Sequence, residues 1–371
     1  MRVAVIGHTY VVDANRGKWR ALAPRCEAVR LFVPRTWPEP DFWVRENEAA
    51  SDLDIVALDS SDAGRARRWR FGFGAISKEL TSFKPDILHV EAEAGAAIGL
   101  ESAWLRGSAR MTQFVWENIP IESRWRRALA GWNFRATDHL FCGSGGALDA
   151  AKRDGYRGPA SVVAQIGVDL SAVGRAAVVR IADDDRFVIG YVGRMDAKKG
   201  VHVLIEAFGR LDTATEIVFL GNGTDREAIR SRVDASTFAT RVRFVDPVPH
   251  TDVVSYIKGF DVLVLPSVST PGWKEQFGHV LIEAMACGVP VIGTRCGAIP
   301  EVIGDAGIVV EENHAAALAD ALSRLLFDAE ERNRLARAGR QRVQSRYTDE
   351  AIAETMHRAW ADLLNAALRG A

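Results

Sequence analysis

Two carboxylates eight residues apart, Glu275 and Glu283, bracket the glycine-containing start of a predicted helix, which should end at Gly288 and Pro290. The N-terminus of a helix offers unpaired N–H groups and the positive end of a dipole, which suit a phosphate. A spacing of eight places two residues within roughly 80° of each other on a helix. Both carboxylates could then accept hydrogen bonds from hydroxyl groups of one ligand. The segment therefore predicts a site for a molecule that carries phosphate and hydroxyl groups, such as a sugar nucleotide.

A turn earlier in the chain supplies positive charge. Residues 187–191 are expected to form a strand, and Gly193, Arg194 and Lys199 follow it. Arginine binds phosphate through a planar fork, and lysine adds a point charge. Two such cations alone would more simply be solvated loop residues. Because they share a predicted domain with the two carboxylates, we interpret them as ligands of the same phosphate.

Short apolar runs alternate with longer amphipathic stretches. Continuous apolar strands between helices indicate parallel sheets covered on both faces, so the predicted fold class is α/β, doubly wound. The expected strands form two series, at 3–6, 54–58, 86–90, 111–116 and 139–142, and then at 187–190, 216–220, 242–245, 261–265, 289–292 and 307–310.

The length of 371 residues suggests two domains. A polar segment at 169–186, which includes Asp183, Asp184 and Asp185, separates the two series of strands. We predict a Rossmann-like domain at 1–170 and a second one at 171–354. Helical periodicity in the tail predicts that a last helix, at about 355–371, packs back on the first domain. Two such domains would place a cleft between them, at the carboxyl ends of their strands.

Composition excludes several classes of function. The formal net charge of −1 favours neither nucleic acid nor membrane as a partner. Four cysteines without C-x-x-C spacing favour a reduced, cytoplasmic compartment. We expect no secretory signal and no membrane span, because no apolar run approaches ~18 residues. Any contact with a membrane would be peripheral, at its inner face.

Five motifs in the second half occur in the order of a known family. They are Gly193-Arg194 with Lys199-Gly200, then Gly221-Asn222-Gly223, Asp261-Val-Leu-Val-Leu-Pro-Ser267, Glu275-x7-Glu283 and Gly297-Ala-Ile-Pro-Glu-Val-Ile303. The chain resembles the retaining nucleotide-sugar glycosyltransferases of the GT-B fold, family 4, also called group 1. Ala298 replaces a usual glycine. The resemblance is strong over about 190–347 and weaker before it.

The resemblance implies a role for each matching residue. Arg194 and Lys199 would hold the donor diphosphate and stabilise its charge as it leaves, and Glu275 would contact the transferred sugar. Glu283 would accept the ribose hydroxyls. The remaining donor-binding positions are Gly193 and the backbone near Phe277, Gly278, Val280 and Leu281.

The first half departs from the family pattern. The usual Gly-Gly loop after the first strand is missing, and only Gly17 could take that part. His8 and the pair Glu117-Asn118 follow predicted strands, and each is either a structural group or an acceptor contact. Two further carboxylates, Glu91 and Glu93, either bind acceptor hydroxyls or oppose a helix dipole.

The resemblance implies transfer of a hexose-type sugar from a nucleoside-diphosphate sugar to a hydroxyl acceptor. The acceptor would be a carbohydrate, a lipid-linked molecule or a small molecule, as in glycan or polysaccharide biosynthesis. Retention is expected, with no cofactor and no metal ion. Asp52-Leu53-Asp54 has the spacing of a metal motif, but it precedes an apolar run, which places it at the wrong edge of the sheet.

Alternatives stay open at this point. One is an epimerase or hydrolase of nucleotide sugars, and another is a non-catalytic binding subunit. A NAD-dependent oxidoreductase is disfavoured, because no G-x-G-x-x-G follows either first strand.

Two basic stretches rich in aromatic residues, 65–73 and 124–135, bear on the acceptor. In the second, Trp125 and Trp132 fall on one helical stripe. Either this stripe packs on the sheet and the arginines face solvent, or the helix lies in a membrane interface. The same stretches could also bind an anionic acceptor.

Overall fold

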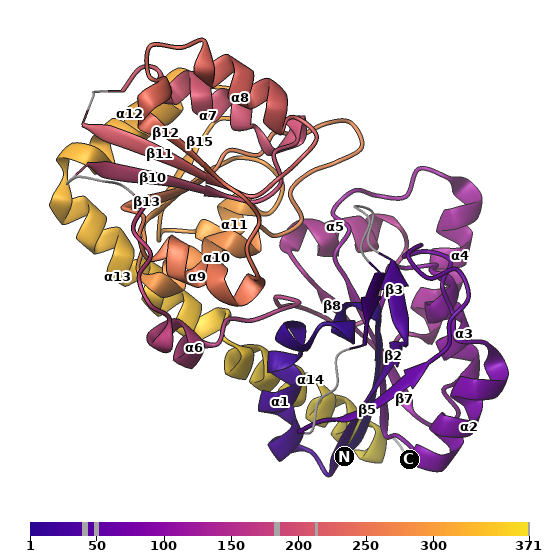
Figure 1. The fold of residues 1–371 in the computed structure, drawn as a ribbon. Coiled ribbons are helices and arrows are strands. Elements are labelled where there is room, and N and C mark those ends of the chain that lie inside the picture. The colour runs from indigo at the N-terminus through magenta and orange to yellow at the C-terminus, as the bar shows by residue number, and fades with distance from the viewer. Residues whose placement is uncertain (39–43, 48–51, 182–185, 212–213, 370–371) are drawn as a thin grey trace. The chain divides into compact units, whose positions relative to one another are not determined.

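The computed structural model describes residues 1–38, 44–47, 52–181, 186–211 and 214–369 (Figure 1). The chain forms two compact units, Met1–Gly167 with Thr348–Ala371, and Val168–Tyr347. The sequence placed the divisions at 170/171 and about 355, and the units change at 167/168 and 347/348. Asp183, Asp184 and Asp185 lie outside the described residues.

The first unit is built on a parallel seven-stranded sheet in the order β5-β2-β1-β6-β7-β8-β9. Its central strands β1 and β6 are mostly apolar and almost entirely buried, as expected for a sheet covered on both faces. The strands are β1 (Arg2–Gly7), β2 (Ala28–Pro34), β5 (Asp54–Leu58), β6 (Ile87–Glu91), β7 (Arg110–Val115), β8 (His139–Cys142) and β9 (Ala160–Val162), with a separate antiparallel pair, β3 (Thr36–Pro38) and β4 (Val44–Glu46).

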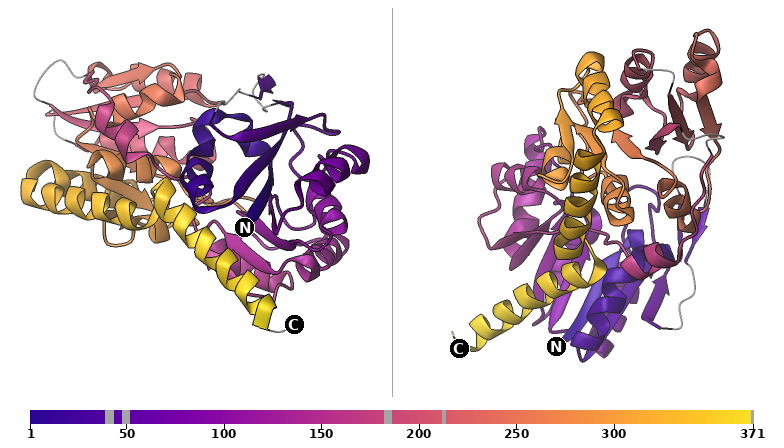
Figure 2. Two further views of the ribbon diagram at one scale, coloured as in Figure 1. Left: turned by 90° about the horizontal axis from the view of Figure 1, so that it is seen from below. Right: turned by 90° about the vertical axis from the view of Figure 1, so that its left-hand side faces the viewer.

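Helices cover both faces of this sheet. In Figure 1, α2, α3 and α4 lie along one side of it, and α1 and α14 along the other. The last helix lies against α1 (Figure 2), and its Ile352, Met356 and Trp360 are fully buried. The helices are α1 (Gly17–Leu22), α2 (Phe73–Phe83), α3 (Ala97–Leu105), α4 (Arg124–Ala136), α5 (Gly145–Arg153) and α14 (Asp349–Arg369), with 3₁₀ turns η1 (His8–Val11), η2 (Asp13–Arg16) and η3 (Ala23–Arg25).

The second unit repeats this architecture on a parallel six-stranded sheet in the order β12-β11-β10-β13-β14-β15. Its strands are β10 (Phe187–Val192), β11 (Thr215–Leu220), β12 (Val242–Val245), β13 (Val262–Leu265), β14 (Val291–Thr294) and β15 (Ile308–Val310). Its helices are α6 (Leu170–Arg175), α7 (Val201–Phe208), α8 (Arg226–Asp234), α9 (His250–Ile257), α10 (His279–Cys287), α11 (Ile299–Ile303), α12 (Ala315–Phe327) and α13 (Ala329–Arg346), with η4 (Ala197–Lys199) and η5 (Ala239–Arg241).

The predicted fold class is confirmed, since both units are α/β and doubly wound. Within each sheet the order reverses beside its first strand, between β1 and β6 and between β10 and β13. Among the described residues, no helix combines the length and the apolar composition needed to cross a bilayer.

Candidate functional site

The predicted residues of the second unit gather at the carboxyl ends of β10 and β13. These two strands pair in parallel, and the strand order reverses between them. In doubly wound sheets such a switch point leaves a crevice in which ligands bind. Gly193 and Arg194 follow β10 directly, and Ser267 and Glu275 lie between β13 and α10.

Three polar side chains meet at this point. The Lys199 ammonium donates to Glu275 Oε2 at 2.7 Å, and the Ser267 hydroxyl donates to the same oxygen at 2.7 Å. The side chains of Lys199 and Glu275 are 18% and 9% exposed. Ser267 is fully buried. The cluster therefore presents a lysine that is fixed in position and still open to a ligand.

Glycines bring the backbones of this cluster close together. Gly200, at φ +66°, lies so close to the Pro266 carbonyl that a Cβ atom would come within 1.9 Å of its oxygen. Gly297, at φ +56°, is similarly close to Glu275. A Cβ atom on Gly297 would come within 2.0 Å of the Glu275 carbonyl oxygen. Other residues pay a steric cost at such φ values, and here they would also clash. These two motif glycines thus fix where Lys199 and Glu275 lie.

Arg194 is the most exposed of the predicted donor ligands. Its side chain is 52% exposed, and its Nε lies 3.4 Å from Asp196 Oδ2. The Tyr191 hydroxyl donates to the Arg194 carbonyl. Burial raises the pKa of Tyr191, and so do the nearby Glu275 and Asp196 carboxylates, so this hydroxyl keeps its proton. The arginine backbone is held while its head group reaches solvent.

The start of α10 corrects the predicted helical relation of the two glutamates. The helix begins at His279, so Glu275 lies four residues before it and shares no helical face with Glu283. Glu275 is placed instead by Lys199, Ser267 and its own backbone, whose carbonyl accepts the Ala298 N–H at 2.9 Å.

The N-terminus of α10 has the geometry expected of an anion site. Gly278 precedes the helix at φ +84°, and within the described part of the chain no side chain caps it. The N–H groups of a first helical turn have no acceptor inside the helix. One predicted donor is already used, because the Leu281 N–H donates to the Gly278 carbonyl at 2.9 Å. Val280 is half-buried, and Phe277 is buried with its ring against Tyr347.

Glu283 lies within α10 beside a histidine. Its Oε1 is 3.8 Å from His250 Nε2, and its side chain is 16% exposed. Burial raises the pKa of Glu283, and a charged His250 would lower it. A buried carboxylate with one distant partner keeps acceptor capacity for a ligand hydroxyl.

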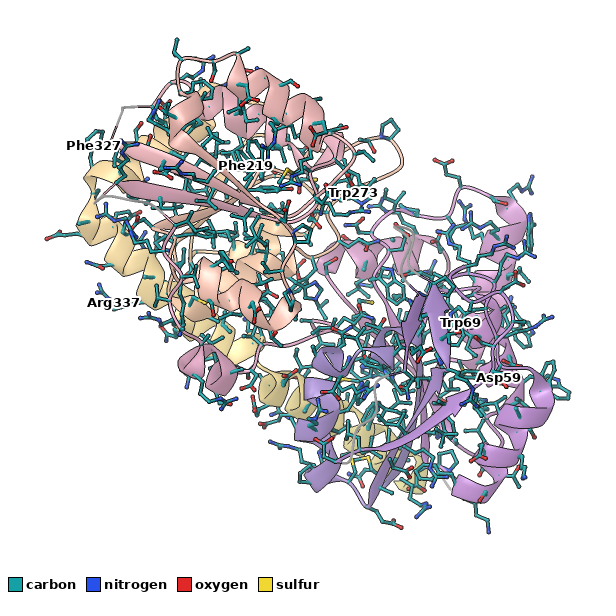
Figure 3. All side chains as sticks on the ribbon, in the orientation of Figure 1. Asp59, Trp69, Phe219, Trp273, Phe327 and Arg337 are labelled. Carbon is teal, nitrogen blue, oxygen red and sulfur yellow. The ribbon has the colours of Figure 1, made fainter. Side chains whose placement is uncertain are left out.

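Trp273 is a candidate that the sequence did not single out. It lies in the segment between β13 and α10, and the Lys198 and Lys199 ammonium groups are each 5.0 Å from its ring centre (Figure 3). Ammonium groups are attracted to the face of an indole ring. The signal available in the sequence was a large aromatic residue two positions before Glu275.

In the first unit, the predicted residue His8 belongs to an aromatic cluster. Its ring centre lies 4.2 Å from that of Trp37, and those of Trp69 and Trp116 are 5.7 and 6.1 Å away. Burial lowers the pKa of His8 to about 4, so the imidazole is neutral at neutral pH.

The side chain of Asp349 occupies the space beside Gly17. A Cβ atom there would come within 2.0 Å of Asp349 Oδ2, at the start of α14. The compactness of Gly17 thus serves the packing of α1 against α14.

Glu93 organises the segment that holds Glu117 and Asn118. Its Oε1 accepts the N–H groups of Trp116 and Glu117, both at 2.9 Å. Burial raises the pKa of Glu93 to about 7. Glu117 itself lies 3.6 Å from Arg67, and Asn118 packs beside Gly146.

Glu91 is part of a fully buried ion pair. Lys18 donates to its Oε1 at 2.6 Å, with the two side chains 1% and 0% exposed. Gln165 donates to Glu91 Oε2 at 3.0 Å, and His89 Nε2 lies 3.4 Å from Glu91 Oε1. Burial opposes ionisation of Glu91, but Lys18 and His89 outweigh it and lower the pKa to about 2. Both oxygens of this carboxylate therefore have partners within the protein.

The aspartates of the metal-like motif are paired with arginines. Arg20 donates to Asp52 at 2.6 Å, and Arg30 donates to Asp54 at 2.7 Å. They occupy the start of β5, at the edge of the sheet opposite to the strand ends discussed above.

The match to a known protein family lies in the second unit. The sequence model of the family described as Glycosyl transferases group 1 matches residues 178–342. The D-inositol 3-phosphate glycosyltransferase of Corynebacterium jeikeium is 30% identical over 195 residues, which are 49% of this chain and 45% of the relative. The glycogen synthase of Mycobacterium tuberculosis is 29% identical over 315 residues, 83% of this chain and 70% of the relative. The chain thus spans about half the length of the first relative.

Solved structures resemble the whole chain. Sucrose-phosphate synthase from Thermosynechococcus elongatus superposes with a TM-score of 0.76 at 23% identity, over 99% of this chain and 100% of that one. HepE of Anabaena in complex with UDP-glucose gives 0.71 at 15% identity, over 99% and 100%. At such identities the likeness concerns the fold. Residues 178–342 thus match the family described as Glycosyl transferases group 1, and the two Rossmann-like units have the GT-B fold of these solved glycosyltransferase structures.

Proposed function

We propose that the protein transfers a hexose-type sugar from a nucleoside-diphosphate sugar to a hydroxyl acceptor, with retention of the anomer and without a metal ion. The observation that carries this proposal is the cluster of Lys199, Glu275 and Ser267 beside Arg194, at the carboxyl ends of β10 and β13. It combines cations for a diphosphate with a carboxylate for sugar hydroxyls.

In this reaction the bond between the sugar and the donor phosphate breaks, and its electron pair leaves with the diphosphate. Negative charge then grows on the diphosphate. The Lys199 ammonium is held in advance by Glu275, so it stabilises this charge without reorganising, and the Arg194 guanidinium reaches the diphosphate from a backbone that the Tyr191 hydroxyl holds. Two such cations can do for the diphosphate what a divalent ion does in other enzymes.

The acceptor oxygen forms the new bond to the sugar, and we propose that its proton passes to an oxygen of the leaving diphosphate. Attack from the same face then gives retention. This route needs no protein base, in keeping with Glu91, which is already paired inside the first unit.

The start of α10 extends the proposed donor site. We assign the first-turn N–H groups near Gly278 and Val280 to a phosphate or sugar oxygen, with Gly193 and Phe277 lining the site. Glu283 would accept the ribose hydroxyls. A uridine nucleotide is the first donor to test, because a structural neighbour was solved with UDP-glucose.

The first unit would supply the acceptor contacts, among them His8, Glu117 and Asn118, whereas Gly17 packs against Asp349. We propose an acceptor in the class of carbohydrates, lipid-linked molecules or small polyols, used in glycan or polysaccharide synthesis. The four cysteines are free, which supports a cytoplasmic location, with peripheral contact at the inner face of the membrane.

The proposal is tested in two steps. A thermal-shift screen against UDP-, GDP-, ADP- and TDP-sugars should identify one donor class, since a ligand at ~100 Kd adds about 2.7 kcal/mol of stability. That donor is then incubated with and without an acceptor mixture, in the presence of EDTA. Acceptor-dependent glycoside with the donor's anomeric configuration is the expected product. Epimerised or hydrolysed sugar at an equal rate without acceptor would replace this proposal by the epimerase or hydrolase alternative.

A further inference from the structure

The helix α4 presents an unusual outer face. Its sequence holds four arginines and two tryptophans and no acidic residue. The Trp125 and Trp132 side chains are 67% and 45% exposed, whereas Ala130, Asn133 and Phe134 are buried against the unit. Of the two alternatives that the sequence left open, packing of the tryptophan stripe on the sheet is therefore excluded.

Five exposed residues of α4 form one continuous strip. At 100° per residue, Arg124, Trp125, Ala128, Trp132 and Arg135 fall within an arc of about 100°. Both tryptophans occupy one margin of this arc. An exposed indole costs a soluble protein hydrophobic free energy that a partner could recover.

A basic hollow adjoins the other margin of the strip. It has a volume of about 790 Å³ and is lined by residues that include Arg124, Arg127, Arg135, Arg157 and Asp154. Asp154 lies 3.5 Å from Arg127 and also accepts the Ile121 N–H. The lining thus holds four guanidinium groups and one carboxylate, and the hollow carries a clear excess of positive charge.

Aromatic residues continue on the neighbouring helices of the same layer. Trp104 of α3 and Phe73 of α2 are 70% and 51% exposed, with ring centres 5.1 Å apart. The helices α2, α3 and α4 lie on one side of the first sheet (Figure 1), and α3 packs against α4. Exposed aromatic side chains therefore occur across this layer.

We propose that the α4 surface, defined as Arg124, Trp125, Arg127, Trp132, Arg135 and Arg157, docks on a bilayer of anionic phospholipid. Phosphate head groups would enter the arginine hollow, and the two indole rings would lie at the boundary between head groups and acyl chains. Charge complementarity alone would fit any polyanion. The paired exposed tryptophans select a lipid interface, because indole rings favour such a boundary.

This inference deepens the peripheral membrane contact proposed above and names the surface and the lipid class. It concerns binding alone, so it is tested without turnover. The full-length protein is sedimented with sucrose-loaded vesicles of phosphatidylcholine, with and without phosphatidylglycerol. We expect binding to the anionic vesicles that falls as salt is raised, and weak binding to the neutral ones.

Two double variants examine the two components. Arg124→Ala with Arg135→Ala should lower the partition coefficient roughly 30-fold, from about 1 kcal/mol for each cation near an anionic surface. Trp125→Ser with Trp132→Ser should abolish quenching of tryptophan fluorescence by brominated lipid at this surface and lower binding at every salt concentration. Arg127 is kept, because it donates to the Ile121 carbonyl.

Matched variants on the second unit serve as controls. Arg232→Ala with Arg337→Ala removes two exposed arginines, and Phe327→Ser removes a ring that is 78% exposed. These should bind vesicles like the parent protein, and circular dichroism should show every variant folded. Equal losses in the controls, or no binding to anionic vesicles, would overturn the proposal. Binding of a soluble polyanion such as heparin without vesicle binding would do the same and would point to an acidic glycan. Donor turnover that persists in either case leaves the transferase proposal untouched.

Discussion

The two Rossmann-like units place polar side chains at equivalent strand ends and use them differently. In the second unit, Lys199 and Glu275 are paired but remain 18% and 9% exposed, and Arg194 is half exposed. In the first unit, Lys18 and Glu91 are paired at almost the same distance, 2.6 Å, and are fully buried. The same chemical pair thus belongs to an open site in one unit and to the interior in the other.

Exposure explains this difference in use. A buried charge pair has already lost its hydration, and its two members depend on each other. A pair at the surface keeps water as an alternative partner, which a diphosphate can replace. The comparison teaches that an ion pair at a switch point indicates a ligand site only where solvent reaches it.

The contrast between the buried pair and the open pair would fail if removing Lys18 hardly changed the free energy of unfolding. Lys18→Met leaves the Glu91 carboxylate buried without its main partner, so the free energy of unfolding should fall by about 3–5 kcal/mol. Urea denaturation measures this loss. Arg35→Met is the matched control, because Arg35 and Asp59 form a pair that is 61% and 89% exposed. It should cost less than about 1 kcal/mol. Equal losses would remove burial as the distinguishing property.

A second variant sharpens the account of the open site. Gly297→Ala forces a Cβ atom against the Glu275 carbonyl at a φ of +56° and should displace Glu275 from Lys199. We expect kcat to fall about 10–100-fold, because small displacements at a reacting centre have effects of this size. Steady-state kinetics with the identified donor measures it. Gly272→Ala, in the segment between β13 and α10 that carries Glu275, has no atom within 4 Å of its added Cβ and should be nearly neutral. A similar loss in both variants would contradict the role assigned to Gly297.

The smallest expected effect concerns Glu93, whose pKa of about 7 lies above the ordinary value of 4.5. Between these two values the folded state binds the proton more tightly than the unfolded chain. Its contribution to stability is therefore full below pH 4.5, falls as the pH rises, and is lost above pH 7. Because the side chain is half-buried, we expect a change of about 1–2 kcal/mol over this window relative to Glu93→Gln. Parallel pH dependence in the parent and the variant would contradict a raised pKa for Glu93.

Much of the second unit could be predicted from sequence because its information is local. The turn after β10, the strand ending in Pro266-Ser267 and the helix from His279 each follow from short patterns of apolar, glycine and proline residues. The strands of the first unit were predicted less completely. The strand β2 was missed because Arg30 interrupts its apolar run, and β9 was missed because Ser161 interrupts a run of only three residues.

Contacts between distant residues could not be predicted in this way. Lys18 and Glu91 are 73 positions apart, and Asp349 fills the space beside Gly17 from the other end of the chain. The helical relation of Glu275 and Glu283 was predicted wrongly, since spacing does not tell where a helix begins. The sequence also left open whether Trp125 and Trp132 face the sheet or solvent, because a stripe of residues does not reveal which side of a helix is covered.

The most direct test of the central claim is binding of UDP, or of the nucleoside diphosphate of the identified donor, to Lys199→Ala by calorimetry. Lys198→Ala is the matched control, since both ammonium groups lie 5.0 Å from the Trp273 ring and only Lys199 donates to Glu275. If Lys199 holds the diphosphate, its variant should bind at least tenfold more weakly, and turnover should fall about 10²–10³-fold. The Lys198 variant should resemble the parent. Unchanged affinity and turnover in Lys199→Ala would contradict the assignment of this cluster as the donor site.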